Sequence, residues 1–320
     1  MKNPKKLNLA NLPTPLEQLA FEGKKFLMKR DDYTGLDFSG NKIRKLEYLL
    51  YRAKQKRTDI IFTCGGEQSN HCRAAASAAA KLGIKTRLFL WGNDSKNADG
   101  NLLLDKLYGV QISFLNKKNY ENVNNIMTEE SEKLTRQNKK VYVIPEGGST
   151  TTGIWGYISF MNELKKQVNL KQKTGILCAA GTGGTAAGML LGAALNKLNL
   201  KIFAVNVLYP KEVLKKKIMY LVEGCIADFK MNVKVNFSNL EIIDGYSKEG
   251  YKNISDGKLK LINKFAASSG IVLDPAYTGK AFNAYHQHFL KKGKGMKVIF
   301  LHTGGMFGVF SKRSRYLTNI

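Results

Sequence analysis

Short apolar runs rich in β-branched and aromatic residues alternate along the chain with segments of helical periodicity. The runs predict strands at residues 60–63, 86–90, 110–114, 141–144, 175–178, 202–205 and 297–301. The segments between them predict helices at residues 73–82, 122–137, 155–167, 185–198, 211–223, 259–268 and 278–292. Strand, helix, strand repetition is typical of parallel sheets covered by helices on both faces. The sequence therefore predicts an α/β fold built on open parallel sheets.

The composition is that of an ordinary globular protein, with 43% hydrophobic and 24% charged residues in a chain of 320. A chain of this length is expected to form two domains. The basic N-terminal residues 1–6 are followed by no apolar run of signal-peptide length, and no later segment reaches membrane-spanning length. We therefore expect no membrane association and a cytoplasmic location.

The formal net charge of +26 raises the question of nucleic-acid binding, because dense positive charge is the footprint of proteins that bind phosphate backbones. The lysines, however, are scattered over predicted helix ends and turns, without a binding motif or a stripe of interleaved aromatic residues. This distribution favours solubility and weak attraction of anionic ligands, so we expect no nucleic-acid partner. A basic nucleic-acid or anion-binding protein stays open as a competing hypothesis, and it predicts a colourless protein with salt-sensitive retention on DNA.

The four cysteines show neither CxxC spacing nor a pairing pattern, so we expect neither a metal site nor a disulfide framework. Cys64 and Cys178 end apolar runs and are expected to be buried and inert. Cys72 lies in a polar loop, which leaves its reactivity open.

Glycines follow four of the predicted strands. They lie at residues 65–66, 147–148, 181–184 and 304–305. In parallel sheets ligands collect at the carboxyl ends of strands, where loops lead into helix N-termini. We therefore expect a cleft whose rim is built from distant parts of the chain.

Residues 180–188, Ala-Gly-Thr-Gly-Gly-Thr-Ala-Ala-Gly, directly follow a predicted strand and open a helix rich in alanine and leucine. Small residues expose backbone N–H groups and the helix dipole adds partial positive charge, so this loop can hold one phosphate. It lacks the Gly-Lys-Ser/Thr ending of a Walker loop, and the strand after its helix lacks the acidic residue of a dinucleotide-binding fold. Taken alone, the loop fits a tight strand-to-helix turn as well as a phosphate site.

Residues 40–47, Gly-Asn-Lys-Ile-Arg-Lys-Leu-Glu, place Lys42 directly behind a glycine turn at the start of a predicted helix. Glycine lets the backbone approach a ligand closely, and the helix fixes the direction of the amine. A lysine in this position can be held against an aldehyde cofactor. Taken alone, the segment also fits a solvated, basic helix start.

A polar loop before another predicted helix carries Gln68, Ser69, Asn70 and His71 in succession. Donors gathered at a helix N-terminus suit a carboxylate, whereas helix capping explains Ser69 or Asn70 but not all four residues.

Two tyrosines stand near predicted turns, Tyr277 at the entry to a helix and Tyr251 beside Gly250. Phenols can stack on a flat cofactor or move protons. Each tyrosine taken alone also fits a packed residue with its hydroxyl at the surface.

Taken together and in order, several segments resemble the pyridoxal-phosphate (PLP) enzymes comprising D-cysteine desulfhydrase and 1-aminocyclopropane-1-carboxylate (ACC) deaminase. The resemblance covers nearly the whole chain, at residues 13–16, 29–32, 40–47, 68–71, 145–149, 181–185, 273–280 and 302–305. It implies the tryptophan-synthase-β-like fold (PLP fold type II), with two open parallel-sheet domains and the cofactor pyridoxal 5′-phosphate in the cleft. It also implies a large domain of residues 1–47 plus 158–320, a small domain of residues 48–157, and a homodimer acting on a small amino acid.

The resemblance further implies roles for individual residues. Lys42 would be joined to the cofactor aldehyde, with Asn41 placing it and Lys45 adding charge for the phosphate. The residues implied in catalysis are Lys42, Ser69, Tyr277 and Tyr251; those in cofactor binding are Lys42, Asn41, Lys45, Asn70, Gly181, Thr182, Gly183, Gly184, Thr185, Thr278 and Thr303; and those in substrate binding are Gln68, Ser69, Asn70 and His71. Asn70 would contact the phenolic oxygen of the cofactor, and Thr303 and Thr278 its pyridine nitrogen.

The residue after the motif tyrosine bears on which reaction is catalysed. After the motif tyrosine, ACC deaminases typically carry glutamate and desulfhydrase-like members threonine, and this chain has Thr278. The resemblance therefore favours a carbon-sulfur lyase that carries out α,β-elimination on a small D-amino acid, most simply D-cysteine, giving pyruvate, hydrogen sulfide and ammonia. ACC deamination to 2-oxobutanoate and ammonia, and elimination from another β-substituted amino acid, stay open.

Glu67 departs from the apolar residue usual before Gln-Ser-Asn in this family. In the substrate pocket its carboxylate would repel an anionic side chain or attract an amine. Pointing into solvent, it would do neither.

Overall fold

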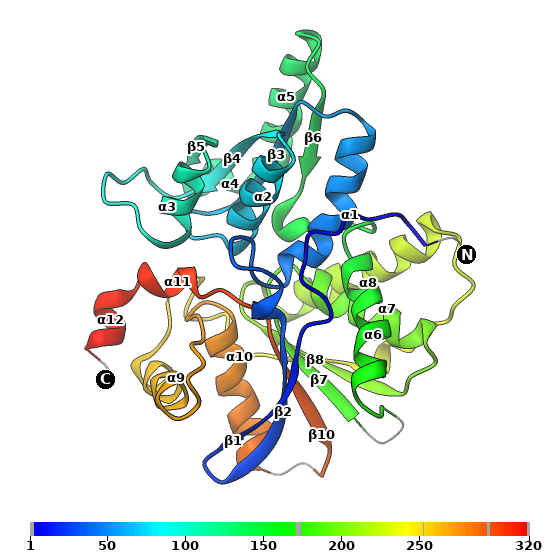
Figure 1. Cartoon of the computed structure of the whole chain (residues 1–320), viewed down its shortest axis with the longest axis vertical. Coiled ribbons are helices and arrows are strands. Elements are labelled where there is room, and N and C mark those ends of the chain that lie inside the picture. The colour runs from blue at the N-terminus through cyan, green and yellow to red at the C-terminus, as the bar shows by residue number, and fades with distance from the viewer. Residues whose placement is uncertain (1–2, 171–173, 252, 293–294, 319–320) are drawn as a thin grey trace.

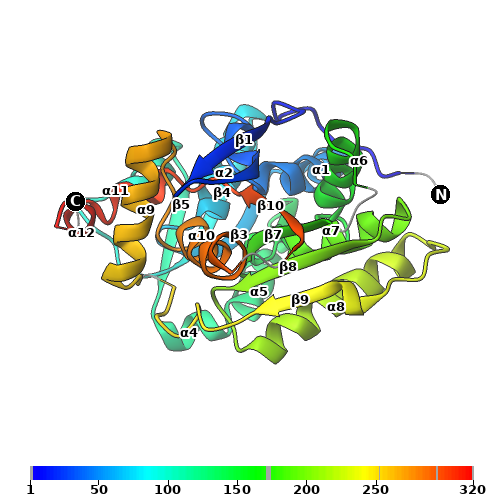
Figure 2. The same cartoon turned by 90° about the horizontal axis from the view of Figure 1, so that it is seen from below.

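The computed structural model describes residues 3–170, 174–251, 253–292 and 295–318. It contains a six-stranded sheet in the order β1-β2-β10-β7-β8-β9 and a four-stranded sheet in the order β5-β4-β3-β6 (Figures 1 and 2). Every pairing in the two sheets is parallel except that of β1 with β2. The predicted α/β fold with two parallel-sheet domains is confirmed.

The strands are β1 (Leu16–Phe21), β2 (Lys24–Arg30), β3 (Ile60–Gly66), β4 (Lys85–Trp91), β5 (Gln111–Leu115), β6 (Val141–Ile144), β7 (Thr174–Ala180), β8 (Leu200–Asn206), β9 (Leu240–Ile243) and β10 (Lys297–His302). The longer helices are α1 (Lys42–Gln55), α2 (Asn70–Lys81), α3 (Gly100–Leu107), α5 (Val123–Arg136), α6 (Trp155–Gln167), α7 (Gly184–Leu195), α8 (Lys211–Asp228), α9 (Asp256–Ser269) and α10 (Thr278–Tyr285). Short helical turns are η1 (Asp31–Tyr33), α4 (Lys117–Glu121), η2 (Glu146–Gly148), η3 (Phe237–Asn239), η4 (His286–Lys291), α11 (Phe307–Phe310) and α12 (Arg313–Leu317).

The six-stranded sheet separates two hydrophobic cores because side chains alternate between its faces. On β10, Ile299 and Leu301 pack into the core beneath α6, α7 and α8, while Val298 and Phe300 pack into the core beneath α9 and α10. The β7 residues 174–180 are all buried. Burial on both faces explains why this strand has a continuous apolar sequence rather than alternation of apolar and polar residues.

An antiparallel hairpin of β1 and β2 forms one edge of this sheet and was not predicted. Glu22 and Gly23 connect the strands with φ angles of 48° and 72°. Two consecutive positive φ angles suit a tight two-residue hairpin turn. Because β1 and β2 have exposed positions, their sequences lack the apolar runs that marked the central strands.

The four-stranded sheet is covered in the same way. Ile61 on β3 packs with α1 and α2, and its neighbour Phe62 packs on the opposite face with residues of α5. All strands of this sheet lie between residues 48 and 157, although the domain limits themselves stay a prediction.

Cys64 and Cys178 are buried, as predicted, and so are Cys72 and Cys225; all four are free thiols. Burial raises the pKa of Cys72 well above that of a free thiol, so the thiolate is disfavoured at neutral pH.

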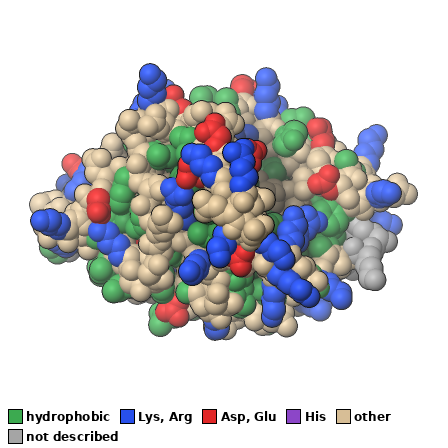
Figure 3. All heavy atoms as spheres, turned by 90° about the horizontal axis from the view of Figure 1, so that it is seen from above, with side chains coloured by type: hydrophobic (Ala, Val, Ile, Leu, Met, Phe, Trp, Pro, Cys, Tyr) green, Lys and Arg blue, Asp and Glu red, His purple; other side chains and the backbone are tan. Residues whose placement is uncertain are grey.

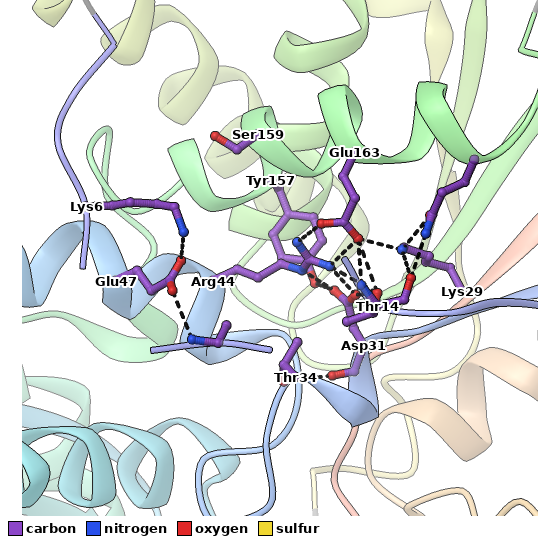
Figure 4. A network of polar contacts seen from close by, with 12 residues as sticks. Lys6, Thr14, Lys29, Asp31, Thr34, Arg44, Glu47, Tyr157, Ser159 and Glu163 are labelled. Carbon is purple, nitrogen blue, oxygen red and sulfur yellow. Dashed lines mark hydrogen bonds and ion pairs between the residues drawn. The ribbon is translucent and has the colours of Figure 1, made fainter. Parts of the chain in front are cut away.

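A buried ionic network joins α1 to α6 and to the N-terminal segment (Figure 4). Arg44 on α1 pairs with Asp31 and with Glu163 on α6, each at 2.8 Å. Glu163 also pairs with the fully buried Lys29 at 2.6 Å, and Tyr157 donates a hydrogen bond to Asp31 at 2.5 Å. Buried charges are tolerated when they are paired and hydrogen-bonded in this way.

The predicted helix 278–292 is divided in the structure. The α-helix α10 ends at Tyr285, and a π-helical turn, His286–Lys291, follows it to within one residue of the predicted end. Helices α3 and α4 and strand β9 were not predicted.

Among the described residues, no helix has the length and apolar character needed to cross a membrane. On the face seen in Figure 3, lysine and arginine side chains are spread over the surface with aspartates and glutamates among them.

Candidate active site

A cavity lies where loops at the carboxyl ends of both sheets meet. The loops come from β3, β6 and β7, and Thr303 follows β10 directly. The residues lining it are Asn41, Lys42, Lys45, Gly65, Gly66, Ser69, Asn70, His71, Trp91, Tyr120, Glu146, Gly147, Ala179, Ala180, Gly181, Thr182, Gly183, Gly184, Thr185, Leu208, Tyr251, Tyr277 and Thr303. Three of the four predicted glycine loops therefore border one cavity, and the fourth packs beside it.

The fourth loop positions the helix that carries Lys42. A Cβ on Gly40 would lie 2.6 Å from the Thr303 carbonyl oxygen, and a Cβ on Gly304 would lie 2.6 Å from Gly40 Cα. Both glycines have positive φ angles, 100° and 83°, which other residues adopt only with strain. This close approach lets Asn41 N–H donate to the Thr303 carbonyl at 3.1 Å, which fixes the start of α1.

Lys42 is the first residue of α1, and its Nζ donates a hydrogen bond to Asn41 Oδ1 at 2.9 Å. The same nitrogen lies 5.6 Å from the centroid of the Tyr277 ring. Burial lowers the pKa of Lys42 to about 8, against the opposing charges of Asp274 and Glu146. A substantial fraction of this amine is therefore unprotonated near neutral pH and can act as a nucleophile or base.

An anion pocket lies beside Lys42, at the start of α7. Lys45 Nζ donates to the Gly147 carbonyl at 3.2 Å and to Ser149 Oγ at 3.1 Å, and Ser149 Oγ contacts Thr182 Oγ1 at 2.7 Å. Asn41 Nδ2 donates to Thr185 Oγ1 at 2.9 Å. Hydroxyls, a lysine and a helix N-terminus converge on this point.

Two observations show that this pocket fits a phosphate. A Cβ on Gly184 would lie 2.5 Å from Ser149 Oγ and 2.7 Å from Lys45 Nζ, so the glycine keeps the space open. Burial, and then the charge of Lys42, lower the pKa of Lys45 well below that of a free lysine. An anion bound here would offset that cost because it supplies the missing counter-charge.

The loop between β3 and α2 forms the facing wall. Ser69 caps α2, with its Oγ accepting from Cys72 N–H at 3.2 Å, and Asn70 Oδ1 accepts from Asn101 Nδ2 at 2.9 Å. His71 Nε2 contacts Thr63 Oγ1 at 2.9 Å, while its buried Nδ1 has no partner among the described residues. Burial lowers the pKa of His71 well below that of a free histidine, so the ring is neutral.

Tyr251 and Tyr277 form an edge-to-face pair, with ring centroids 5.7 Å apart. Both line the cavity, and Tyr251 Oη donates to the Gln68 carbonyl at 3.3 Å. Burial raises the pKa of both phenols above that of free tyrosine, so both carry their protons at neutral pH. They can therefore stack on a flat ligand or donate a proton.

Two residues expected near the ligand, Gln68 and Thr278, lie outside the cavity lining. Gln68 accepts a hydrogen bond from Asn101 N–H at 2.9 Å and lines a neighbouring pocket. Thr278 is fully buried and donates to Asp274 Oδ1 at 2.5 Å. Glu67 also lines the neighbouring pocket, where its Oε2 accepts from Asn93 N–H at 3.2 Å. The carboxylate that we considered for the substrate pocket is thus placed outside it.

Sequence reasoning missed Glu146, which supplies a carboxylate to the cavity. Glu146 Oε1 accepts from Tyr120 Oη at 2.8 Å and Oε2 from Tyr209 Oη at 2.9 Å. Its one sequence signal is its place between Pro145 and the glycine pair 147–148, at the end of a predicted strand.

Comparisons with known proteins agree with this geometry. Residues 7–304 match the family model described as "Pyridoxal-phosphate dependent enzyme". A Thermotoga maritima protein is 38% identical over 97% of this chain and 99% of its own length, and its name gives it provisionally as a 1-aminocyclopropane-1-carboxylate deaminase. The mitochondrial bifunctional D-cysteine desulfhydrase/1-aminocyclopropane-1-carboxylate deaminase of Arabidopsis thaliana is 35% identical over 95% of this chain and 79% of its own length.

A solved structure of an ACC deaminase homologue superposes with a TM-score of 0.91 at 36% identity, covering 100% of this chain and 97% of that chain. A hydrogen sulfide-producing enzyme from Fusobacterium nucleatum, at 17% identity and a TM-score of 0.66, shares the fold.

Proposed function

The chain belongs to the pyridoxal-phosphate-dependent enzymes, and from that premise we propose that it is a lyase acting by α,β-elimination on a small D-amino acid. D-cysteine is the simplest substrate, and its products would be pyruvate, hydrogen sulfide and ammonia. The observation that supports the proposal most directly is Lys42, whose amine has a pKa of about 8 inside a cavity that also holds an anion pocket. The cofactor is pyridoxal 5′-phosphate.

The cavity offers a separate set of groups to each end of this cofactor. Lys42 would bind its aldehyde carbon, and Lys45 with the loop 181–185 would hold its phosphate. Asn70 and Thr303 also line the cavity, where they would contact the ring substituents. When bound, the cofactor withdraws electrons from the α-carbon of an amino acid, which makes the α-proton removable.

The chain's own residues would carry the substrate and the protons. Ser69, with the N-terminus of α2 behind it, would receive the substrate carboxylate, since Ser69 and the first two residues of this helix line the cavity. Lys42 would take the α-proton, because its lowered pKa leaves the amine partly unprotonated. Tyr277, 5.6 Å from Lys42 Nζ by its ring centroid, would hold or donate a proton on the same side.

Thr278 favours D-cysteine over ACC as the substrate. In the family that this chain resembles, ACC deaminases typically carry glutamate at the position where this chain has threonine. A D-cysteine desulfhydrase of Salmonella paratyphi A is 30% identical over 96% of this chain and 95% of its own length. ACC deaminase activity is nevertheless the second candidate, because the name of the Arabidopsis relative combines both activities.

A substrate panel tests the proposal. The purified holoenzyme is incubated separately with D-cysteine, L-cysteine, D-serine and ACC, and keto acid and sulfide are measured. We expect pyruvate and sulfide in equal amounts from D-cysteine. Formation of 2-oxobutanoate from ACC without sulfide from D-cysteine would reverse the order of the two candidates, and keto acid from none of the four would refute both.

We also propose that the enzyme is a homodimer, as the family resemblance implies, and that it works in the cytoplasm. Light scattering after size-exclusion chromatography tests the assembly, and a mass near the 35.7 kDa of one chain would contradict it.

A further inference from the structure

Glu146 is the one acidic side chain among the described residues that line the active-site cavity. It follows β6 directly after Pro145, and the carbonyl of the next residue, Gly147, accepts a hydrogen bond from Lys45. The carboxylate therefore lies close to the proposed cofactor site, but its two oxygens accept hydrogen bonds from tyrosines.

Two phenols hold the Glu146 carboxylate in place. Tyr120 of α4 donates to Oε1, and Tyr209, which follows β8 of the other sheet, donates to Oε2. Burial and the charge of Glu146 raise the pKa of both phenols, which keeps them protonated as donors. Because the two oxygens accept hydrogen bonds from residues that follow strands of different sheets, the carboxylate is held at the cavity wall.

The cations of the cavity have other partners. Lys42 and Lys45 are the only lysines or arginines among the described residues of the lining, and the proposed function assigns both of them to the cofactor. Lys217 lies near Tyr209, with its Nζ 4.8 Å from the ring centroid, but it lines an adjoining groove and not the cavity. The charge of Glu146 acts on Lys42, Tyr251 and Tyr277, which the proposed function places beside the reacting atoms. This side of the cavity therefore has a negative wall.

We propose that Glu146 selects substrates by charge, so that the site accepts amino acids with a neutral or cationic side chain and rejects those with an anionic one. This inference rests on the proposed function, because it takes an amino acid as the ligand of this cavity. Two like charges brought together away from water repel strongly, whereas an amide or thiol meets the same carboxylate without that cost. The expected discrimination is at least about tenfold in dissociation constant, which corresponds to about 1.4 kcal/mol.

Asparagine and aspartate provide the test, because they differ in charge but hardly in shape. Each handedness of both amino acids is titrated into the holoenzyme, and binding is followed by the change in the absorption spectrum of the cofactor, without any turnover. For the handedness that binds, asparagine should bind at least about tenfold more tightly than aspartate to the wild type. Glu146→Gln should reduce this ratio to about one by improving aspartate binding.

Glu67→Gln is the matched control. Glu67 is also a glutamate at the end of a strand, but it lines the neighbouring pocket, so its replacement should leave the ratio unchanged. An equal shift in both variants would point to overall charge and overturn the role of Glu146. Equal binding of aspartate and asparagine by the wild type would overturn it without any variant, and so would the failure of asparagine of either handedness to bind.

This test is separate from the test of the proposed reaction. Suppose that the preference for asparagine over aspartate depends on Glu146 but that D-cysteine gives no sulfide. The inference about Glu146 would then stand, and the proposed reaction would be refuted. Sulfide from D-cysteine with an unchanged ratio in Glu146→Gln would do the opposite.

Discussion

The Arg44 guanidinium and the Asp31 carboxylate form a two-point ion pair inside the protein, with Nε to Oδ2 at 2.9 Å and Nη2 to Oδ1 at 2.8 Å (Figure 4). Both side chains are buried, and Arg44 also reaches Glu163 on α6 at 2.8 Å. Arg44 lies on α1 just after Lys42. The network therefore holds the helix that carries the active-site amine.

Replacing Arg44 by alanine should destabilise the protein strongly. The change leaves the Asp31 and Glu163 carboxylates buried without their shared cation, for which the expected loss is about 3–5 kcal/mol in the free energy of unfolding. Urea denaturation measures it. Lys133→Ala removes the exposed pair with Glu130 and should cost about 0.5 kcal/mol or less. Similar losses in the two variants would contradict the importance of burial.

The contribution of Glu163 to stability should disappear in acid. Burial opposes its ionisation, but Arg44 and Lys29 hold the pKa of Glu163 down at about 2, below the value of 4.5 for an unpaired glutamate. A lowered pKa in the folded state gives stability above pH 4.5 that is lost as the pH falls from 4.5 towards 2.

The difference in free energy of unfolding between the wild type and Glu163→Gln should therefore shrink across this pH range. Glu132→Gln, at an exposed position of α5, should show no such trend. A constant difference for Glu163→Gln would show that its ionic contacts do not govern the acid response.

Gly184→Ala should weaken cofactor binding without unfolding the protein. The added Cβ would lie 2.5 Å from Ser149 Oγ and 2.7 Å from Lys45 Nζ, which fills the space assigned to the phosphate. We expect the dissociation constant for pyridoxal 5′-phosphate to rise about tenfold or more, measured by titration of the apoenzyme. Gly257→Ala on α9 meets no atom within 4 Å and should leave the constant unchanged. Unaltered binding by Gly184→Ala would place the phosphate elsewhere.

Lys42→Ala should abolish the yellow colour of the purified protein, because the amine proposed to bind the cofactor aldehyde would be missing. Lys280→Met is the control, since burial also lowers the pKa of Lys280 to about 8 but its Nζ donates to the Gly250 carbonyl outside the cavity. This variant should stay yellow. In the wild type, attachment of the cofactor to the apoenzyme should accelerate as the pH rises through about 8, where Lys42 loses its proton. Colour retained in Lys42→Ala would refute the assignment.

Much of the fold was predictable because its central strands are buried on both faces. Such strands have continuous apolar sequences, as β7 does. The helices between them differ from the strands because their apolar residues recur with the period of a helix. The edge hairpin β1–β2 has exposed positions, and β9 is only four residues long and half-buried at its first two, so neither gave such a signal. The division of the predicted helix 278–292 at His286 depends on packing and hydrogen bonding that a periodicity cannot indicate.

The candidate site was predictable where one short segment defines both a residue and its surroundings. Lys42 behind Gly40, and the loop 181–185 before its helix, are examples, and the structure places them around one cavity. Gln68 and Thr278 stand within recognisable motifs, but their side chains bond to Asn101 and Asp274 instead of lining that cavity. A motif gives the residue type, and the rotamer depends on neighbours from elsewhere in the chain.

The sequence by itself determined the order of the central strands along the chain, the glycine loops, and the lysine proposed to bind the cofactor, because each depends on residues adjacent in the chain. Only the tertiary structure decided which carboxylate lines the cavity. Glu146 is fixed by Tyr120, 26 residues before it, and by Tyr209, 63 residues after it, while Glu67 is placed in the next pocket. Contacts across such separations arise from the packing of the two sheets, and no local pattern encodes them.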